Sequence, residues 1–266
     1  MVERFHKDGY LILENCVSPG ALADVKRLLL GACRDIEKNL SQVPEAQADI
    51  DHFLLERPRY VDKQQYQELT ALLSGNFSRE VKAHPSLWAL LSETRLRSVL
   101  KTVLRSENLY LHMFPSPRHV APSSRYAAVP RHVDRQYNSH LSNFITVWVP
   151  VETFEPNMGG VCVFPGTHFS TEHFSGGDGR RLETDLWFAP IRQDLDEGVL
   201  AEVPRRGALL LHQSLVHESV LNRSSMTRLS VDLRIFGDSD RTTKHYLDLQ
   251  TFEVFEPPTG EIHGKF

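Results

Sequence analysis

The chain has 266 residues, of which 41% are hydrophobic, enough for a substantial core in one large domain. Its formal net charge is -4 and its pI about 6.4, without the concentrated basic face of a nucleic-acid-binding protein. We therefore expect no nucleic-acid partner, and no membrane partner either, because no apolar run approaches the length of a membrane span.

The cysteines and the N-terminus predict a cytoplasmic protein. The three cysteines, Cys16, Cys33 and Cys162, are odd in number and include no CxxC pair. A disulfide framework is therefore not expected, and a reducing compartment suits the chain. The N-terminus is charged from Glu3 onward, unlike a secretory signal peptide.

The first part of the chain reads as a helical support over about residues 18–105. A short strand is expected at residues 9–13, and Ser18-Pro19 then supplies an N-cap and a first helical residue. A polar, helix-prone stretch runs to about Ser78. A second helix is predicted from about Pro85, with leucines and valines at helical spacing through Leu104.

After Ser106 the pattern changes to short strands, which predict a barrel over about residues 106–236. Segments rich in Val, Phe, Tyr and Trp lie between Pro, Gly and Asn. The candidate strands are Leu109–Phe114, Phe144–Val151, Gly160–Phe164, Ala208–His212 and Arg228–Phe236. The last alternates apolar and polar residues, which suits a barrel wall with helices outside and a polar site within.

Two further segments complete the predicted single domain, which spans residues 1–266. Residues 170–200 lack a clear pattern and are expected to form an insertion, either a lid or a substrate loop. The polar tail over residues 237–266 is expected to wrap the surface.

The first chemical feature is His132-Val133-Asp134. On an extended chain, residues i and i+2 project to the same side, so one imidazole and one carboxylate could bind a single ion. A third ligand from a distant strand would complete the facial triad of non-haem Fe(II) oxygenases. His212 and His217 are the candidates, and strand parity places them on opposite sides, with His217 favoured.

Arg228 is a candidate for binding a 2-oxo acid co-substrate. It opens the last barrel strand on its polar face. A planar guanidinium pairs with a distal carboxylate through two hydrogen bonds, which suits this role.

Taken in order, these motifs resemble the phytanoyl-CoA dioxygenase family of 2-oxoglutarate-dependent oxygenases. The resemblance runs from about Phe5 to Phe236. The motifs that carry it are Phe5-His-Lys-Asp-Gly9-Tyr10, Val147-Trp-Val-Pro-Val151, Asn157-Met-Gly-Gly160, Phe164-Pro-Gly-Thr-His168 and Gly207 through Ser219. It implies an α+β fold with a mainly β core, a double-stranded β-helix (a jelly-roll or cupin-like barrel) with the N-terminal helices packed on one face.

The resemblance also implies roles for individual residues. His132, Asp134 and His217 match the iron ligands, which decides between the two candidate histidines. Arg228 and Ser219 match residues that bind the distal carboxylate of 2-oxoglutarate. Trp148 matches an aromatic residue that lines the co-substrate pocket, and Thr146, on the same strand face, is expected to add a hydrogen bond there. Fe(II), 2-oxoglutarate and O₂ are the implied cofactors.

The sequence departs from the family pattern in two places. Val133 stands where the family often has Gln, and Pro115-Ser-Pro117-Arg118 stands where relatives often have a Lys-Pro pair. His168 belongs to the Pro-Gly-Thr-His turn, where a structural hydrogen bond is expected rather than iron ligation.

The implied reaction is oxidation, by default hydroxylation, of an unactivated C–H bond of a small molecule, with release of succinate and CO₂. Asp134 argues against halogenation, because related halogenases lack that carboxylate. Specialised or natural-product biosynthesis is the expected setting. The substrate-pocket candidates are Met113, Arg118, Gln136, Tyr137 and Asn143. The alternatives are a cupin-like metal-dependent isomerase or hydrolase, and a non-catalytic ligand-binding relative.

Overall fold

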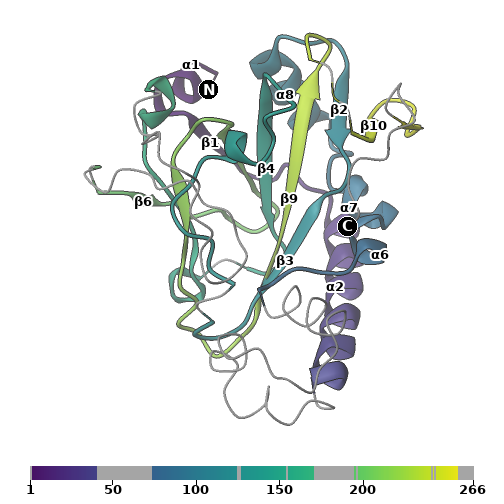
Figure 1. Cartoon of the computed structure of the whole chain (residues 1–266), viewed down its shortest axis with the longest axis vertical. Helices are drawn as coiled ribbons and strands as arrows, with labels where there is room; N and C mark the ends of the chain where they lie inside the picture. The colour runs from purple at the N-terminus through teal and green to yellow at the C-terminus, as the bar shows by residue number, and fades with distance from the viewer. Residues whose placement is uncertain are drawn as a thin grey trace.

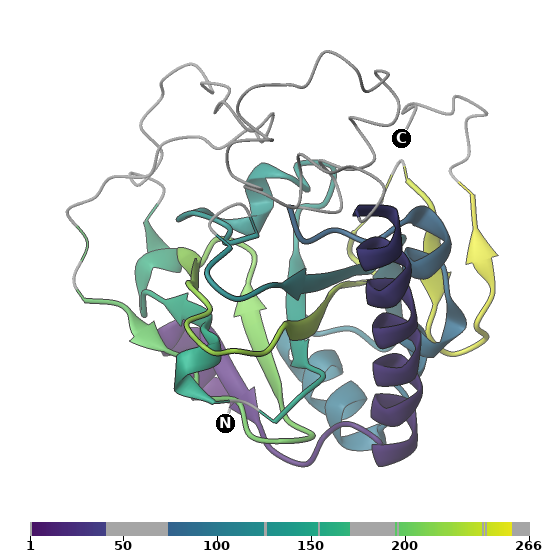
Figure 2. The ribbon, with the colours of Figure 1, turned by 90° about the horizontal axis from the view of Figure 1, so that it is seen from below.

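The computed structural model describes residues 2–40, 74–124, 127–153, 155–170, 195, 197–240, 242 and 244–256. A large antiparallel sheet has helices on one side and a three-stranded sheet on the other, as Figures 1 and 2 show. This arrangement confirms the predicted α+β class. Most of the polar stretch before Ser78 and most of the predicted insertion over residues 170–200, including Trp187 and Phe188, lie outside the described residues.

The large sheet has eight strands, and β9 is at its centre. In spatial order they are β1 (Tyr10–Leu13), β7 (Ala208–His212), β4 (Phe144–Pro150), β9 (Arg228–Gly237), β2 (Leu109–His112), β10 (Tyr246–Asp248) and β11 (Val254–Phe255). β3 (Ser116–Val120) follows β2 along the same edge of β9. Every strand predicted in this sheet is present, and β3, β10 and β11 are additional strands.

β9 separates the hydrophobic core from the interior of the barrel. Leu233 and its cross-strand partner Val147 are both 0% exposed and belong to the core shared with the helices. The alternate residues of β9 project to the other side, toward the small sheet. All seven residues of β4 are buried, because this strand is covered on both faces.

The helices α1 (Val2–Asp8), α2 (Pro19–Leu40), α6 (Arg79–Lys82), α7 (Pro85–Ala89) and α8 (Thr94–Leu104) precede most of the barrel. α2 begins at Pro19 as predicted, and the Ser18 hydroxyl accepts a hydrogen bond from the Ala21 N–H at 3.5 Å. α1 was not predicted.

The single helix expected from Pro85 is wrong, because the chain breaks between α7 and α8. Glu93 is extended and forms the N-cap position of α8. The break leaves the Leu91 carbonyl free of a helical partner, and the Arg97 side chain donates to it at 2.6 Å. Leu90 and Leu91 are still 0% exposed, so the apolar pattern reports burial correctly but not the break.

The small sheet joins β6 (Val199–Leu200), β5 (Gly160–Val163) and β8 (His217–Val220). The short 3₁₀ helices η1 (Asp134–Gln136), η2 (Pro156–Met158) and η3 (Thr167–Phe169) lie in the connections. β6 is the described end of the predicted insertion, which therefore contributes a strand.

The tail does more than wrap the surface, which corrects the prediction. β10 and β11 extend the large sheet, and Leu247 and Leu249 are 0% and 2% exposed within the core. These two leucines stand in an otherwise polar segment, too short a pattern to identify a strand. Within the described ranges, no helix combines the length and hydropathy required to cross a membrane.

Candidate metal centre

Backbone pairing brings His132 and His217 together. The His132 N–H donates to the His217 carbonyl at 2.9 Å, and the His217 N–H donates back at 3.0 Å, so His132 extends the edge of β8. Val133 is extended, and Asp134 then begins η1. The predicted i, i+2 relation is therefore realised at a strand-to-3₁₀ junction rather than along a full strand.

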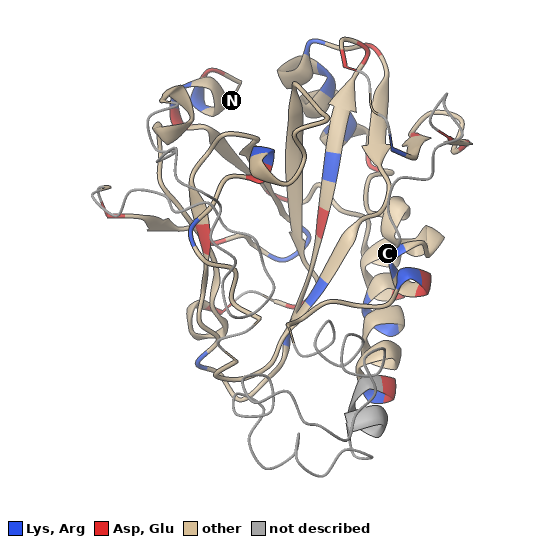
Figure 3. Ribbon diagram, viewed as in Figure 1, with Lys and Arg blue, Asp and Glu red and all other residues tan. Residues whose placement is uncertain are grey.

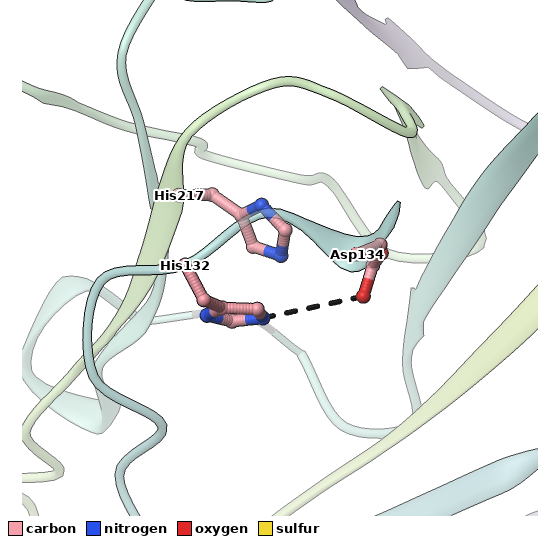
Figure 4. Close-up of side chains that lie close together, drawn as sticks. All are labelled: His132, Asp134 and His217. Carbon is pink, nitrogen blue, oxygen red and sulfur yellow. Dashed lines mark ion pairs between the residues drawn. The ribbon is translucent and has the colours of Figure 1, made fainter. Parts of the chain in front are cut away.

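The three predicted ligands converge. One ligand atom from each of His132, Asp134 and His217 lies within 4.8 Å of the others, and the side chains are buried. The His132 Nε2 and Asp134 Oδ1 atoms are 4.0 Å apart. Figure 4 shows both imidazoles directed toward the carboxylate. His212 lies on the helix-covered face instead, with its ring 6.3 Å from that of Phe5.

Each imidazole is fixed in the tautomer that a metal requires. The Nδ1 atom of His132 lies 2.7 Å from the Pro130 carbonyl, and that of His217 lies 2.9 Å from the Leu215 carbonyl. A carbonyl only accepts, so Nδ1 carries the proton and Nε2 offers its lone pair to the centre of the cluster.

The Asp134 carboxylate is held by its own partners. Thr146 Oγ1 donates to its Oδ2 atom, and Arg234 Nη2 lies 3.5 Å from its Oδ1 atom. Burial alone would raise the pKa of Asp134, but the Arg234 guanidinium, the two neighbouring histidines and the Thr146 hydrogen bond outweigh it and lower the pKa to about 2. The residue is therefore an ionised ligand at neutral pH.

The donor set fits Fe(II). Burial, reinforced by the neighbouring His217, lowers the pKa of His132 to about 3, so its imidazole is neutral and free to ligate. Two imidazole nitrogens and one carboxylate on one side of a site are the facial triad that leaves coordination positions open for other ligands.

Arg228 opens β9 on its inner face and is 6% exposed. Its Nε and Nη1 atoms are buried, and neither has a hydrogen-bond partner within the described part of the chain. Burial, followed by the charge of Arg118, lowers the pKa of Arg228 to about 10. An orphaned, buried guanidinium is suited to a carboxylate ligand.

Trp148, Ser219 and Thr146 are the other predicted co-substrate residues. Trp148 is 3% exposed and lines a small cavity together with Arg228. Ser219 is in β8, two residues after His217, so both side chains project to the same side. Thr146 makes its hydrogen bond to the ligand Asp134, as described above.

The five substrate-pocket candidates have different surroundings. Arg118 has structural partners, since its guanidinium donates to the carbonyls of Ser74 and Ala127, each at 3.0 Å. Met113 is 7% exposed and packs in the main core.

The other three candidates lie in or after η1, or before β4. Tyr137 is 39% exposed, and the centroid of its ring lies 5.6 Å from that of the His132 ring. Both amide atoms of the Gln136 side chain are buried and lack hydrogen-bond partners among the described residues. Asn143 is exposed, and its backbone N–H donates to Asp240 at 2.9 Å, so nothing places its side chain in the pocket.

Sequence reasoning missed Arg234 as a site residue. β9 carries bands of both charges (Figure 3), and Arg228, Asp232 and Arg234 share its inner face. The alternation of β9 already placed Arg234 inside the barrel. Its contact with Asp134 depends on how η1 approaches β9, which no local pattern reports.

Comparisons with known proteins agree with this architecture. The family described as phytanoyl-CoA dioxygenase (PhyH) matches residues 5–230. Among curated protein sequences, none matches the chain.

Three solved structures are similar. The non-haem alpha ketoglutarate-dependent carbocyclase SnoK from nogalamycin biosynthesis has 14% identity and a TM-score of 0.52, over 98% of this chain and 92% of that one. The epimerase SnoN, in complex with Fe³⁺, alpha ketoglutarate and nogalamycin RO, has 14% identity and a TM-score of 0.51, over 89% and 82%. EctD from S. alaskensis, with 2-oxoglutarate and 5-hydroxyectoine, has 16% identity and a TM-score of 0.54, over 91% and 77%. These likenesses confirm the double-stranded β-helix fold.

Proposed function

The chain belongs to the phytanoyl-CoA dioxygenase family of Fe(II)- and 2-oxoglutarate-dependent oxygenases, and on that premise we propose that it oxidises a C–H bond of a small molecule. Hydroxylation is the proposed outcome, with succinate and CO₂ as co-products. The observation that carries the proposal is the buried cluster of His132, Asp134 and His217, with its donor atoms within 4.8 Å of one another.

In this proposal the triad holds Fe(II), which together with 2-oxoglutarate and O₂ supplies the oxidising power. The protein's own residues preorganise the site. The Pro130 and Leu215 carbonyls orient the two imidazoles, while Thr146 and Arg234 fix the Asp134 carboxylate. Retention of Asp134 speaks for oxygenation rather than halogenation, because the carboxylate takes the position a halide would need.

Arg228 is the proposed partner of the distal carboxylate of 2-oxoglutarate. Its support is the pair of buried guanidinium nitrogens that have no partner in the described structure. Ser219 is proposed to donate a second hydrogen bond to that carboxylate, and Trp148 to form an apolar wall beside it. This unpartnered arginine is the feature that favours use of 2-oxoglutarate over a metal-dependent isomerase or hydrolase with the same triad.

We place the reaction in specialised biosynthesis. The support is the likeness in fold to two enzymes of nogalamycin biosynthesis, SnoK and SnoN. Family members act on small molecules, and we propose a small-molecule substrate here as well.

The test is a calorimetric titration of the Fe(II)-loaded protein with 2-oxoglutarate without oxygen, followed by measurement of succinate in air. Wild-type protein should bind 2-oxoglutarate and release succinate slowly even without substrate. Arg228→Met should bind it at least about 100-fold more weakly, because a charge-assisted, two-pronged contact is lost. Arg205→Met, an exposed arginine in a turn, is the control and should bind as wild type does.

The proposal fails if wild-type protein binds no 2-oxoglutarate and yields no succinate with Fe(II). It also fails if zinc supports turnover of a substrate without 2-oxoglutarate, the behaviour of a hydrolase. Equal affinity for 2-oxoglutarate in the wild type and in Arg228→Met would show that Arg228 does not bind the co-substrate.

A further inference from the structure

A second polar cluster lies on the inner face of the large sheet, next to the triad. His112 ends β2, and because Leu111 pairs with Ile235, His112 comes beside Arg234. The His112 ring lies 4.8 Å from the ring of His140, measured between centroids. His140 follows η1, the element that begins with Asp134. Three separate parts of the chain thus meet at one point.

Four nitrogen atoms of this cluster are buried and have no hydrogen-bond partner among the described residues. They are the two ring nitrogens of His112, Nε2 of His140 and Nε of Arg234. His112 is only 8% exposed, so bulk water does not satisfy its ring. Buried polar groups without partners are costly, so their presence together on one face points to a ligand that completes them.

Arg234 connects the cluster to the metal centre. One of its terminal nitrogens lies 3.5 Å from Asp134 Oδ1, and the other donates to the Ser116 hydroxyl at 3.1 Å. The Nε–H takes part in neither contact and has no partner among the described residues. A group bound there lies directly beside the triad, where a substrate must be held for its C–H bond to react.

Arg234 and Arg228 are too far apart to bind the same carboxylate of one small molecule. They are six residues apart on β9, which corresponds to about 20 Å along a strand. If Arg228 binds the distal carboxylate of 2-oxoglutarate, Arg234 is available to a different ligand.

The charge around Arg234 favours an anion. Lys82 and Arg118 both lie close enough to Arg234 to interact with its charge. The pKa of Lys82 is lowered by burial first, and then by the charges of Arg118 and Arg234. Asp134 and Asp232 are the opposing carboxylates near Arg234 within the described ranges. The two negative charges of 2-oxoglutarate would offset the two positive charges of Fe(II), so binding of both would leave the local excess of positive charge around Arg234 in place.

We infer that His112, His140 and Arg234 bind an oxyanion of the primary substrate, such as a carboxylate or a sulfate-like group, and so select an anionic small molecule. This inference rests on the proposed function, because it names the substrate class of the same site. The two imidazoles act as neutral N–H donors and the guanidinium as the cationic one.

The experiment is a calorimetric titration of the Fe(II)-loaded protein, without oxygen and saturated with 2-oxoglutarate, with acetate and with inorganic sulfate. At least one anion should bind at a single site, and acetamide, which has no charge, should not. The affinity of that anion should fall at least tenfold in His112→Leu and in Arg234→Met. His112→Gln retains a side-chain donor and should recover part of the affinity.

His212→Leu is the matched control and should bind the anion as the wild type does. His212 is also a partly buried histidine on a strand of the same sheet, but it faces the helices. The preference between acetate and sulfate distinguishes a carboxylate from a tetrahedral oxyanion. Melting temperatures of all variants identify any that fail to fold, in which case His140→Leu replaces His112→Leu.

The inference is overturned if neither anion binds to the 2-oxoglutarate complex of the wild type, or if both bind equally well to His112→Leu and Arg234→Met. Failure of the proposed function appears separately, as absent 2-oxoglutarate binding in the preceding titration. A wild type that binds 2-oxoglutarate but no anion therefore refutes the substrate class alone.

Discussion

The two faces of β9 carry opposite kinds of residue on one backbone. Toward the helices, Leu233 and its neighbours Val231 and Ile235 are 0% exposed and fully surrounded by apolar side chains. Toward the barrel interior, Arg228 and Arg234 are also largely buried, yet each retains guanidinium nitrogens without partners in the described structure. On the helix-covered face, the protein's own side chains make all the apolar contacts. On the inner face, we propose that ligands supply the hydrogen bonds that the guanidinium nitrogens lack.

This difference indicates that the helix-covered face of β9 stabilises the fold, whereas its inner face binds ligands. Apolar burial contributes to folding in proportion to the area removed from water. Buried polar groups without partners oppose folding, and a protein retains them where a ligand supplies the missing bonds. Substitutions on the two faces should therefore affect different measurements.

The largest effect is expected on the inner side, from Asp134→Ala. Removing the carboxylate ligand should abolish 2-oxoglutarate turnover, by more than about 1,000-fold, while the fold is retained. Succinate release and circular dichroism measure the two properties. Glu218→Gln is the control, because Glu218 lies beside His217 but pairs with Arg131 at 3.2 Å. Normal turnover in Asp134→Ala would contradict the assignment of the metal ligands.

On the helix-covered face, Leu233→Ala should destabilise the protein by about 2–5 kcal/mol, because it leaves a cavity in a closely packed core. Denaturant unfolding of the metal-free protein measures this free energy. Ser230→Ala on the inner face of β9 is the matched control, with an expected change below about 1 kcal/mol. Equal losses in the two variants would show that both faces contribute alike to stability.

Thr146→Val tests the support of the metal ligand. The substitution keeps the shape of the side chain but removes the hydroxyl that donates to Asp134. Metal affinity, measured by calorimetry with Co(II), should fall about tenfold, with little change in unfolding. Thr102→Val removes a hydroxyl that donates to the Ser98 carbonyl on α8 and should leave affinity unchanged. An unaltered affinity in Thr146→Val would mean that Arg234 alone positions the carboxylate.

The smallest expected effect is a pH dependence of stability. Burial lowers the pKa of His212, on the helix-covered face, from 6.5 to about 4. The unfolded chain therefore takes up a proton before the folded one, and stability should decrease as the pH falls from about 6.5 to 4. His212→Gln should show a shallower decrease in melting temperature across this interval. A slope identical to that of the wild type would assign the effect to other groups.

Local sequence determined much of the fold and the chemical identity of the site. The alternation along Arg228–Gly237 separates core from interior, since side chains of a strand must alternate. Ser18-Pro19 marks the start of α2, because the cap and the fixed proline backbone act within one turn. The apolar patterns of β4, β7 and β9 predict these strands from their own residues. The HxD pair and Arg228 can be identified because Fe(II) requires imidazole and carboxylate ligands and a bound carboxylate suits a guanidinium.

Tertiary structure decided everything that depends on contacts between distant segments. Parity favoured His217 over His212 only weakly, whereas the bridge between His132 and His217 puts the ligand atoms together. The role of Arg234 depends on the approach of η1 to β9, and the strands of the tail form only because the edge of β2 offers unpaired backbone groups. Periodicity reports which side of an element is buried, but not which remote residue lies opposite, because that is set by packing across the whole chain.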